Sequence, residues 1–254
     1  MASSFLSSVA ARKPASALPP ARGGPLAAAL CALALAAFLP GAQAAGNLLV
    51  NGDAEAAPGS DSGDVVTVPG WATTLGNFTV ATYNPFFGGP DVGSPGPADR
   101  GLNYFAGGPS IAQSQATQLV DLSAFASAIA TGQASYSLSG WFGGFSSQND
   151  YSLMQVHLLD AQGNETEFGD VGHISAGDRS SVTGLLFRTA SGFIPSTTTQ
   201  ALIVLEMNRT DGSYNDGYAD NLSFAVQAVP EPASTVLMLA GLVSIGAWVR
   251  RPRS

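Results

Sequence analysis

The sequence predicts an all-β domain of the sandwich type, with an export signal before it and a membrane-spanning segment after it. Hydrophobic and polar residues alternate along several short segments, which are separated by Gly, Asn and Asp. A period of two is typical of strands with one buried face, and short strands joined by such turns indicate a β-sandwich. Only residues 119–130 show a helical period, and no repeat of fixed length suggests a solenoid or a propeller.

Residues 1–44 are predicted to be a secretory signal peptide. Basic residues precede an apolar run from Leu26 to Leu39, which Pro40 and Gly41 end, and Ala42-Gln43-Ala44 offers a small-x-small cleavage site. This order of regions is that of a signal peptide, and the apolar run is short for a membrane span. A buried core helix is the weaker alternative, because no helical period accompanies the run. The single Cys lies in this segment, so the exported domain is expected to use no disulfides.

Residues 45–228 are predicted to form the β-sandwich. The clearest strands are residues 135–142, 154–159, 200–208 and 219–226. In the first of these, Tyr136, Leu138 and Phe142 share one face, whereas the serines and Trp141 share the other. The third strand has hydrophobic residues on both faces, so both faces are expected to be at least partly buried.

The charge of this middle region excludes some partners. Between residues 46 and 229 there are four Arg, no Lys and 17 acidic residues, which gives a formal charge of −13. Such a surface repels phosphate backbones and anionic lipid. We therefore expect no binding to nucleic acid.

Residues 229–254 are predicted to be a sorting signal with a transmembrane helix. The motif Pro230-Glu231-Pro232 comes first, an uncharged run follows from Ala233 to Val249, and Arg250, Arg251 and Arg253 lie near the end. The run is just long enough to span a bilayer, and the Arg cluster would stay cytoplasmic by the positive-inside rule. A plain membrane anchor is the alternative.

These three parts, in this order, resemble the PEP-CTERM sorting domain of Gram-negative bacteria. In that family a membrane protease of the exosortase type cleaves near the Pro-Glu-Pro motif, and the bacteria usually make extracellular polysaccharide. The resemblance implies a protein that is exported, held in the inner membrane in transit, and then placed at the cell surface or released.

Motifs at both ends of the predicted sandwich also resemble one fold family. Asn47 to Glu55 reads NLLVNGDAE, Val68 to Trp71 reads VPGW, and Tyr218 to Phe224 reads YADNLSF. They are similar to the opening "NLLxNGxFE", the following "PGW" and the closing "YxDNVSL" of galactose-binding-like jelly rolls, which include many carbohydrate-binding modules. Residues 99–121 are similar to the middle of that family. The resemblance implies a jelly-roll β-sandwich of the galactose-binding-like type. Ala54 departs from the pattern, which usually has Phe there.

The same resemblance implies a structural Ca²⁺ where the first and last strands meet. Carried over to this chain, the ligands are the carbonyl of Asp53, the carboxylates of Glu55 and Asp220, and carbonyls from residues 100–103. Carboxylate and carbonyl oxygens are the ligands that Ca²⁺ prefers. The alternative is that Glu55 and Asp220 are ordinary polar residues at strand ends. Residues 211–216 lack the alternating ligands of an EF-hand loop and are expected to form a turn.

Signals for catalysis are weak. The chain has two histidines, His157 and His173, and neither belongs to a His-x-x-x-His or Gly-x-Ser-x-Gly motif. His157 lies in an alternating segment and is expected to be structural, and Glu165 and Glu167 are expected to be solvated in a turn. Two carboxylates across a cleft would suit a glycosidase, but sequence spacing does not show such a pair.

Two classes of function therefore stay open. One is a non-catalytic surface or matrix protein that binds glycan, including the cell's own exopolysaccharide. The other is a secreted hydrolase of polysaccharide or ester substrates with an unrecognised site. The scarcity of histidine and of catalytic motifs favours binding. Aromatic residues near loops are the candidates for stacking on sugar rings: Tyr83, Phe86, Phe87, Tyr104, Trp141 and Tyr214.

Overall fold

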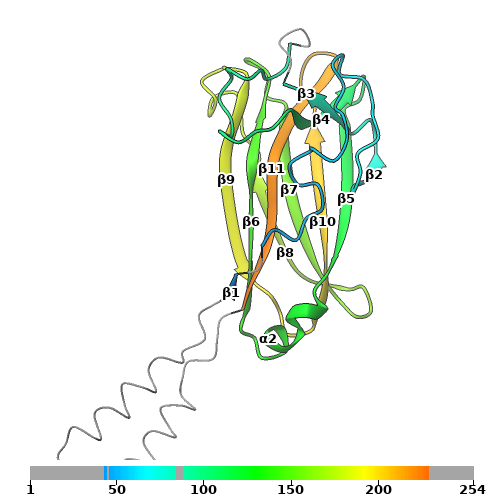
Figure 1. Ribbon diagram of the computed structural model, residues 1–254, viewed down its shortest axis with the longest axis vertical. Helices are drawn as coiled ribbons and strands as arrows, with labels where there is room; N and C mark the ends of the chain where they lie inside the picture. The colour runs from blue at the N-terminus through cyan, green and yellow to red at the C-terminus, as the bar shows by residue number, and fades with distance from the viewer. Residues whose placement is uncertain (1–42, 45, 84–87, 229–254) are drawn as a thin grey trace, which may run out of the picture. The chain divides into compact units, whose positions relative to one another are not determined.

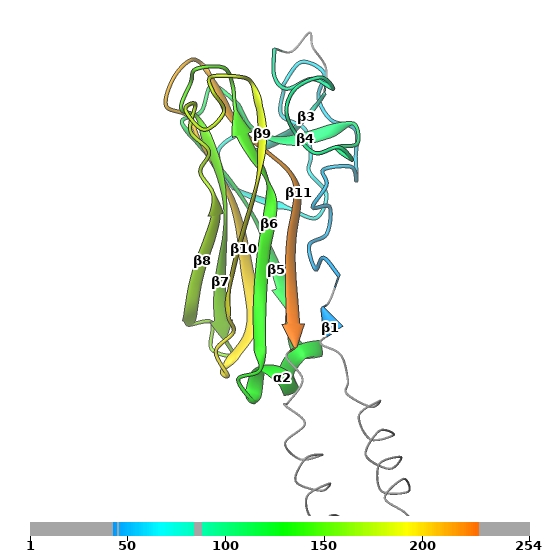
Figure 2. The ribbon, with the colours of Figure 1, turned by 90° about the vertical axis from the view of Figure 1, so that its left-hand side faces the viewer.

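The domain is a sandwich of two antiparallel β-sheets (Figures 1 and 2). The structure is a computed structural model and describes residues 43–44, 46–83 and 88–228. Strands β9, β6 and β11 lie side by side in one layer, and β8, β7 and β10 lie in the other (Figure 2). The predicted all-β fold is confirmed.

Each sheet has its own strand order. The six-stranded sheet runs β3-β4-β11-β6-β9, and β1 also pairs with β11; the five-stranded sheet runs β2-β5-β10-β7-β8. The strands of the first sheet are β1 (Gln43–Ala44), β3 (Thr79–Thr82), β4 (Asn103–Pro109), β6 (Ala134–Gly144), β9 (Gly184–Phe193) and β11 (Tyr214–Ala228). Those of the second sheet are β2 (Ala72–Leu75), β5 (Gln113–Asp121), β7 (Tyr151–Asp160), β8 (Glu165–Gly172) and β10 (Thr198–Asn208).

The connections between the described strands have the jelly-roll pattern. Among them, β3 and β4 are antiparallel neighbours in one sheet and β7 and β8 form a hairpin in the other, whereas the other consecutive strands lie in opposite sheets. Crossing repeatedly between the sheets brings strands that are distant in sequence together, and β11 consequently lies between β4 and β6. The chain therefore forms a jelly-roll β-sandwich.

The main core lies between the two sheets. Residues of β6 alternate between buried and partly exposed along most of the strand, with Tyr136, Leu138 and Phe142 buried and Trp141 on the outer face. In β10 both faces are largely covered, because Ile203, Leu205 and Met207 and also Val204 are buried. These faces agree with the sequence prediction.

The opening segment packs against β11, as the two family motifs predict. The Asn47 side chain donates to the Leu222 carbonyl at 2.8 Å and accepts from the Phe224 amide at 3.1 Å, and the Leu222 amide donates to the Gly52 carbonyl at 2.8 Å. A Cβ on Gly52 would lie 2.3 Å from the Leu222 carbonyl oxygen, so a side chain there would force the segment away from β11.

Several local predictions are corrected. Residues 119–130 are not one helix, because Leu119–Asp121 complete β5 and only Ala126–Ala130 form α2, after a 3-10 turn at Ser123–Phe125. Glu165 and Glu167 lie in β8 rather than in a turn, and Tyr214–Asp216 already belong to β11.

The predicted terminal signals lie mostly outside the described residues. Gln43 and Ala44, at the end of the predicted signal peptide, form β1 and pair with Ala228 and Gln227. The rest of that peptide, the Pro230-Glu231-Pro232 motif, the apolar run and the Arg cluster are not described. Among the residues described, no helical segment has the length and hydrophobicity of a membrane span.

Candidate functional site

A groove lies on the outer face of the six-stranded sheet. It has a volume of about 450 Å³, and we call it the outer groove. The opening segment forms one wall, and β6, β9 and β11 form its floor. Its lining residues are Asn47, Leu49, Asn51, Gly52, Asp53, Asp99, Trp141, Phe187, Asn221, Leu222 and Ser223.

Two aromatic rings meet in this groove. Trp141 of β6 and Phe187 of β9 are paired directly across the two strands, and their ring centroids are 5.8 Å apart with the planes tilted by 60°. Phe187 is 49% exposed, although residues of this kind are usually buried. Large exposed apolar side chains beside polar groups are typical of binding sites.

An uncharged polar strip continues from this aromatic pair along the sheet. Residues that pair across β9, β6 and β11 form rows with one residue from each strand. The first two rows are Thr189–Ser139–Ser223 and Ser191–Ser137–Ala225. The next row contains Phe193, which is 79% exposed, and Ser135. Six residues separate Trp141 from Ser135, which corresponds to roughly 20 Å at the rise of a strand. Exposed aromatic residues thus bracket a hydroxyl-bearing strip.

Amide and carboxylate groups form the polar rim of the outer groove. The Asn221 side chain donates to the Asp99 carboxylate at 3.0 Å, across 122 positions of sequence. Asn221 has a left-handed backbone with φ of 47°, a conformation that Asn tolerates better than most residues. The rim therefore has an amide group, which can donate hydrogen bonds, and a carboxylate, which can accept them, beside the aromatic pair.

The predicted calcium ligands lie near one end of this groove. One oxygen of Glu55 accepts from the amides of Leu102 at 2.8 Å and Asn103 at 2.7 Å. Gly101 has φ of 65°, and a Cβ there would lie 2.5 Å from the same oxygen, so the turn closes tightly on the carboxylate. Glu55 thus fixes the loop at residues 101–103.

Asp220 is fully buried in β11. Its carboxylate accepts from the Tyr83 hydroxyl at 2.7 Å and from the Asn221 amide at 2.7 Å. Burial, with a smaller contribution from the negative charges of Glu55 and Asp53, raises the pKa of Asp220 to about 7, although the hydrogen bonds from Tyr83 and Asn221 oppose the shift. The three predicted ligand residues therefore lie close enough to repel one another.

The predicted ligand atoms are oxygens, which Ca²⁺ prefers, but too few side chains are clustered to enclose an ion by themselves. Among the described residues, no three His, Cys, Asp or Glu side chains form a group that could hold a metal ion. The carboxylates of Glu55 and Asp220, with Asp220 buried beside like charges, are of the oxygen-donor type that suits a hard cation. Glu55, Asp220 and the Asp53 carbonyl would hold such an ion, which would offset the repulsion between the carboxylates.

The predicted sugar-stacking residues differ in accessibility. Tyr104 is fully buried and Tyr83 is 7% exposed, so neither ring is available for stacking, and both are removed from the candidates. They pack in a second small core with Tyr218, at ring distances of 4.9 Å between Tyr83 and Tyr104 and 5.2 Å between Tyr104 and Tyr218. Tyr214 is half-buried and donates to the Gly63 carbonyl. Trp141 stays a candidate, and Phe86 and Phe87 lie outside the described residues.

Two buried acids support the loops at the other side of this tyrosine cluster. Asp150 accepts from the amides of Thr210 at 2.6 Å, Asp211 at 3.1 Å and Asp216 at 2.9 Å. Asp216 accepts from the Tyr218 hydroxyl, and burial raises the pKa of Asp216 to about 6, with the charge of Asp150 adding to the shift. These acids are bound within the domain, which indicates a structural role.

The histidines are not placed as a catalytic pair. His157, on the outer face of the five-stranded sheet, pairs with Glu165 and packs on Phe168. His173 follows β8 and contacts Tyr151 edge-on at 4.2 Å between ring centroids. The structural role expected for His157 agrees with this position.

The family model of the PEP-CTERM protein-sorting motif matches residues 228–254. The chain therefore carries this C-terminal sorting motif, as the Pro-Glu-Pro triplet, the apolar run and the Arg cluster predict. The motif marks the chain as an exported protein. No curated protein matches the chain.

Several solved structures are similar to the domain at low identity. A family 16 carbohydrate-binding module is 20% identical over 70% of this chain and 99% of that module, with a TM-score of 0.44. The enzymatically active domain of tailspike protein 4 from bacteriophage CBA120 is 20% identical over 70% of this chain and 21% of that chain, with a TM-score of 0.43. A Stig cyclase from Fischerella sp. TAU is 15% identical over 74% of this chain and 100% of that chain, with a TM-score of 0.42. At these levels of similarity they say nothing of what this chain binds.

Proposed function

We propose that this exported protein is a non-catalytic surface or matrix protein whose jelly roll binds a neutral glycan on the outer face of the six-stranded sheet. The observation that carries the proposal is the pair of half-buried Trp141 and exposed Phe187 in a groove with a polar rim. An aromatic ring offers the large, flat apolar surface on which the C–H face of a sugar ring can pack. The surrounding hydroxyls, amides and carboxylate match the hydroxyl groups of a sugar, which both donate and accept.

The strip beyond the aromatic pair supports an extended ligand rather than a single sugar. Its rows carry Ser and Thr side chains, and Phe193 stands exposed at the far end, roughly 20 Å away by the strand rise. A linear chain of several sugar units that stacks on Trp141 and Phe187 would cross the hydroxyl strip and reach Phe193.

Charge supports a neutral ligand. The described domain holds four Arg against 17 acidic residues, and the strip itself carries no charged side chain. A polyanionic glycan would meet long-range repulsion from this surface, whereas a neutral one would not.

The C-terminal motif supports the sorting part of the proposal. In this account the apolar run first holds the protein in the inner membrane, and an exosortase-type protease then cleaves near Pro230-Glu231-Pro232. The domain is thereby delivered to the cell surface or the extracellular matrix.

A structural Ca²⁺ is part of the proposal. Glu55, Asp220 and the Asp53 carbonyl would hold the ion, which would fasten the opening segment to β11 at the end of the outer groove. Its role would be to fix one wall of the groove. The buried charge of Asp220 beside Glu55 and Asp53 supports this assignment.

Affinity electrophoresis tests the binding function. The full chain, purified in a detergent without sugar headgroups, is run through native gels that contain xylan, mixed-linkage β-glucan, galactomannan or alginate. We expect at least one neutral glycan, but not alginate, to retard the protein, and Trp141→Ala to abolish the retardation. Phe168→Ala is the control, because Phe168 is 41% exposed on the other sheet.

Three results would contradict the proposal. One is equal retardation of Trp141→Ala and the parent protein. Another is release of reducing ends or acids from the glycans by the parent protein, which would show a hydrolase. Absence of retardation by all the neutral glycans would equally remove the support for a glycan-binding domain.

A further inference from the structure

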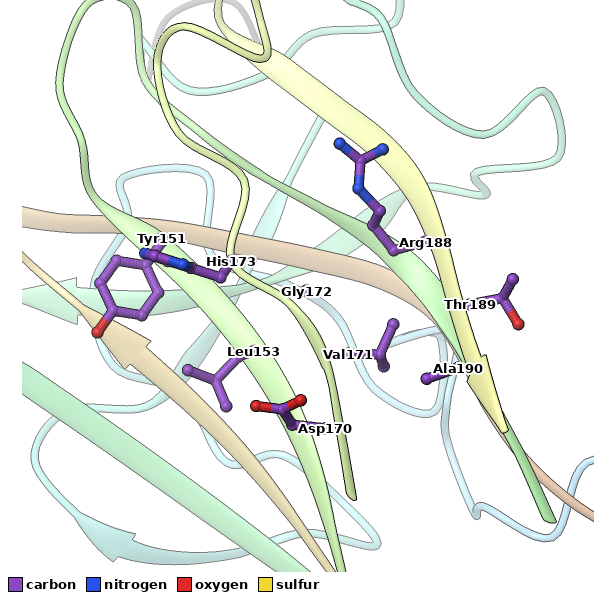
Figure 3. Close-up of a pocket in the computed structure, with 9 residues that line it drawn as sticks. All are labelled: Tyr151, Leu153, Asp170, Val171, Gly172, His173, Arg188, Thr189 and Ala190. Carbon is purple, nitrogen blue, oxygen red and sulfur yellow. The ribbon is translucent and has the colours of Figure 1, made fainter. Parts of the chain in front are cut away.

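A second pocket lies at the open side of the sandwich, between the edge strands β8 and β9 (Figure 3). It has a volume of about 480 Å³, which lies within the usual range for small-ligand sites. Tyr151 and Leu153 come from β7, Asp170 and Val171 from β8, and Arg188 and Ala190 from β9, with Gly172, His173 and Thr189 completing the lining. We call it the edge pocket.

Arg188 gives the edge pocket hydrogen-bond donors. It lies on the same side of β9 as Leu186 and Ala190, which pack against the main core, so a guanidinium stands where an apolar side chain would be expected. The guanidinium donates to the Phe187 carbonyl at 3.0 Å, and it lies 3.8 Å from Asp178, beyond hydrogen-bond distance. By contrast, Arg100 and Arg179 each bind three carbonyl oxygens. Arg188 therefore keeps donors for a ligand.

Asp170 and the aromatic wall complete the pocket. Asp170 is exposed on β8, and within the described part of the chain no hydrogen bond to its carboxylate is formed. His173 is held in place by its backbone, which has φ of 54° and donates to the Ser152 carbonyl at 2.8 Å, while its ring packs edge-on against Tyr151 at 4.2 Å. Figure 3 shows Arg188 on β9, Val171 pointing toward β9, and Tyr151, Leu153 and Asp170 pointing to the other side of β8.

We propose that the edge pocket is a second binding site for a neutral oligosaccharide, in which Arg188 donates to hydroxyl groups at one end of the pocket and Asp170 accepts from hydroxyl groups at the other. Sugar hydroxyls both donate and accept, so a pocket that offers one cationic donor and one anionic acceptor matches an oligosaccharide, whereas an anionic ligand would be repelled by Asp170 and Asp178. The choice of a sugar rests on the proposed function.

The two sites lie on the two faces of one strand. Phe187 faces the outer groove, and the next residue, Arg188, faces the edge pocket. Two sites on one domain would let the protein hold two glycan segments at once, and the avidity of such binding exceeds that of either site. This arrangement suits a protein that links polysaccharide chains.

The two histidines provide the test. His173 lines the edge pocket, whereas His157 lies on the outer face of the five-stranded sheet. The full chain, labelled in its histidine rings and kept in a sugar-free detergent, is titrated with xylohexaose, with cellohexaose and with hexagalacturonate, and the ring signals are followed by NMR. His173→Asn assigns the signals, since Asn tolerates a positive φ.

We expect a neutral hexaose to shift the His173 signals and leave the His157 signals in place. Arg188→Met and Asp170→Asn should each weaken this response at least tenfold, whereas Arg209→Met, which removes a similar charge elsewhere, should not. Trp141→Ala should retain the His173 response, so failure of the outer groove would not hide the edge pocket. The proposal is overturned if neither neutral hexaose shifts His173, if hexagalacturonate alone does, or if the Arg188 and Asp170 variants respond as the parent does.

Discussion

Calcium should stabilise the folded domain measurably if the proposed ion is present. Asp220 is fully buried, and the charges of Glu55 and Asp53 raise its pKa further. A bound cation would relieve this repulsion in the folded state only, because the ligands come from segments that are far apart in the sequence. Removal of calcium should therefore lower the melting temperature.

The magnitude follows from linkage and from the size of the domain. At a calcium concentration one hundred times the Kd, binding adds about 2.7 kcal/mol to the free energy of unfolding. A domain of roughly 180 residues has an unfolding entropy of about 0.4 kcal/mol per kelvin near its midpoint. The quotient is a shift of about 7 °C between calcium-bound and chelated protein.

Thermal melts in EDTA and in millimolar calcium measure this shift. Asp220→Asn should abolish the difference between the two melts, because it removes one of the two ligand charges, whatever it does to the stability of the chelated protein. Glu167→Gln, a change at an exposed site on β8, should leave the difference intact. Superimposed melts of the parent protein in EDTA and in calcium would refute the calcium assignment.

Three further predictions concern the buried acids and the sorting motif. The pKa of Asp216 is about 6 in the folded state and 3.8 in the unfolded state. Between these two pH values the folded state binds more protons than the unfolded state. The free energy of unfolding therefore falls as the pH rises from about 4 to about 6. Asp216→Asn should reduce the fall in the free energy of unfolding between pH 4 and pH 7 by about 3 kcal/mol, as measured by urea melts. The same fall in the parent protein and in the variant would contradict this prediction. Asp150→Ala leaves three backbone amides without an acceptor and should cost at least about 3 kcal/mol in urea melts; a loss below about 1 kcal/mol would show that water replaces the carboxylate. Replacing Pro230-Glu231-Pro232 by three alanines should leave the protein in the inner membrane at nearly full length, and fractionation that finds it released as efficiently as the parent would exclude processing at this motif.

Much of the fold could be predicted because the alternation of hydrophobic and polar residues within a single strand shows which of its side chains are buried. The alternation in β6, β7 and the end of β11 shows on the sequence which side chains are buried, and the structure agrees. The secondary structure of residues 119–130 could not be predicted from their local helical period. Leu119–Asp121 pair with residues 200–202 of β10, and this pairing with a segment distant in sequence overrides the helical period. Glu165 and Glu167 read as a polar turn because an exposed edge strand carries few hydrophobic residues.

The candidate sites depend on contacts that a sequence does not show. Trp141 could be named from the sequence as a candidate for stacking on sugars, but its partner Phe187 is 46 positions away and is placed beside it only by the register of β6 and β9. Tyr83 and Tyr104 look accessible in the sequence because they flank Gly-rich loops, yet they are buried in the second small core with Tyr218 and Leu185. Arg188 and Asp170 likewise line one pocket only because β8 and β9 are the edges of two different sheets.

Tryptophan fluorescence tests the central claim, that glycan binds at the Trp141–Phe187 pair. The chain has three tryptophans, of which Trp71 is 7% exposed in the core whereas Trp141 is half-buried in the outer groove. Saturation of the full chain with the neutral glycan that retards it should shift the emission to shorter wavelength, because a stacked sugar removes water from the indole. Trp141→Phe should lose this shift while keeping most of the affinity, since Phe still offers a ring. Full binding by the parent protein with no change in emission, or an unchanged shift in Trp141→Phe, would contradict the claim.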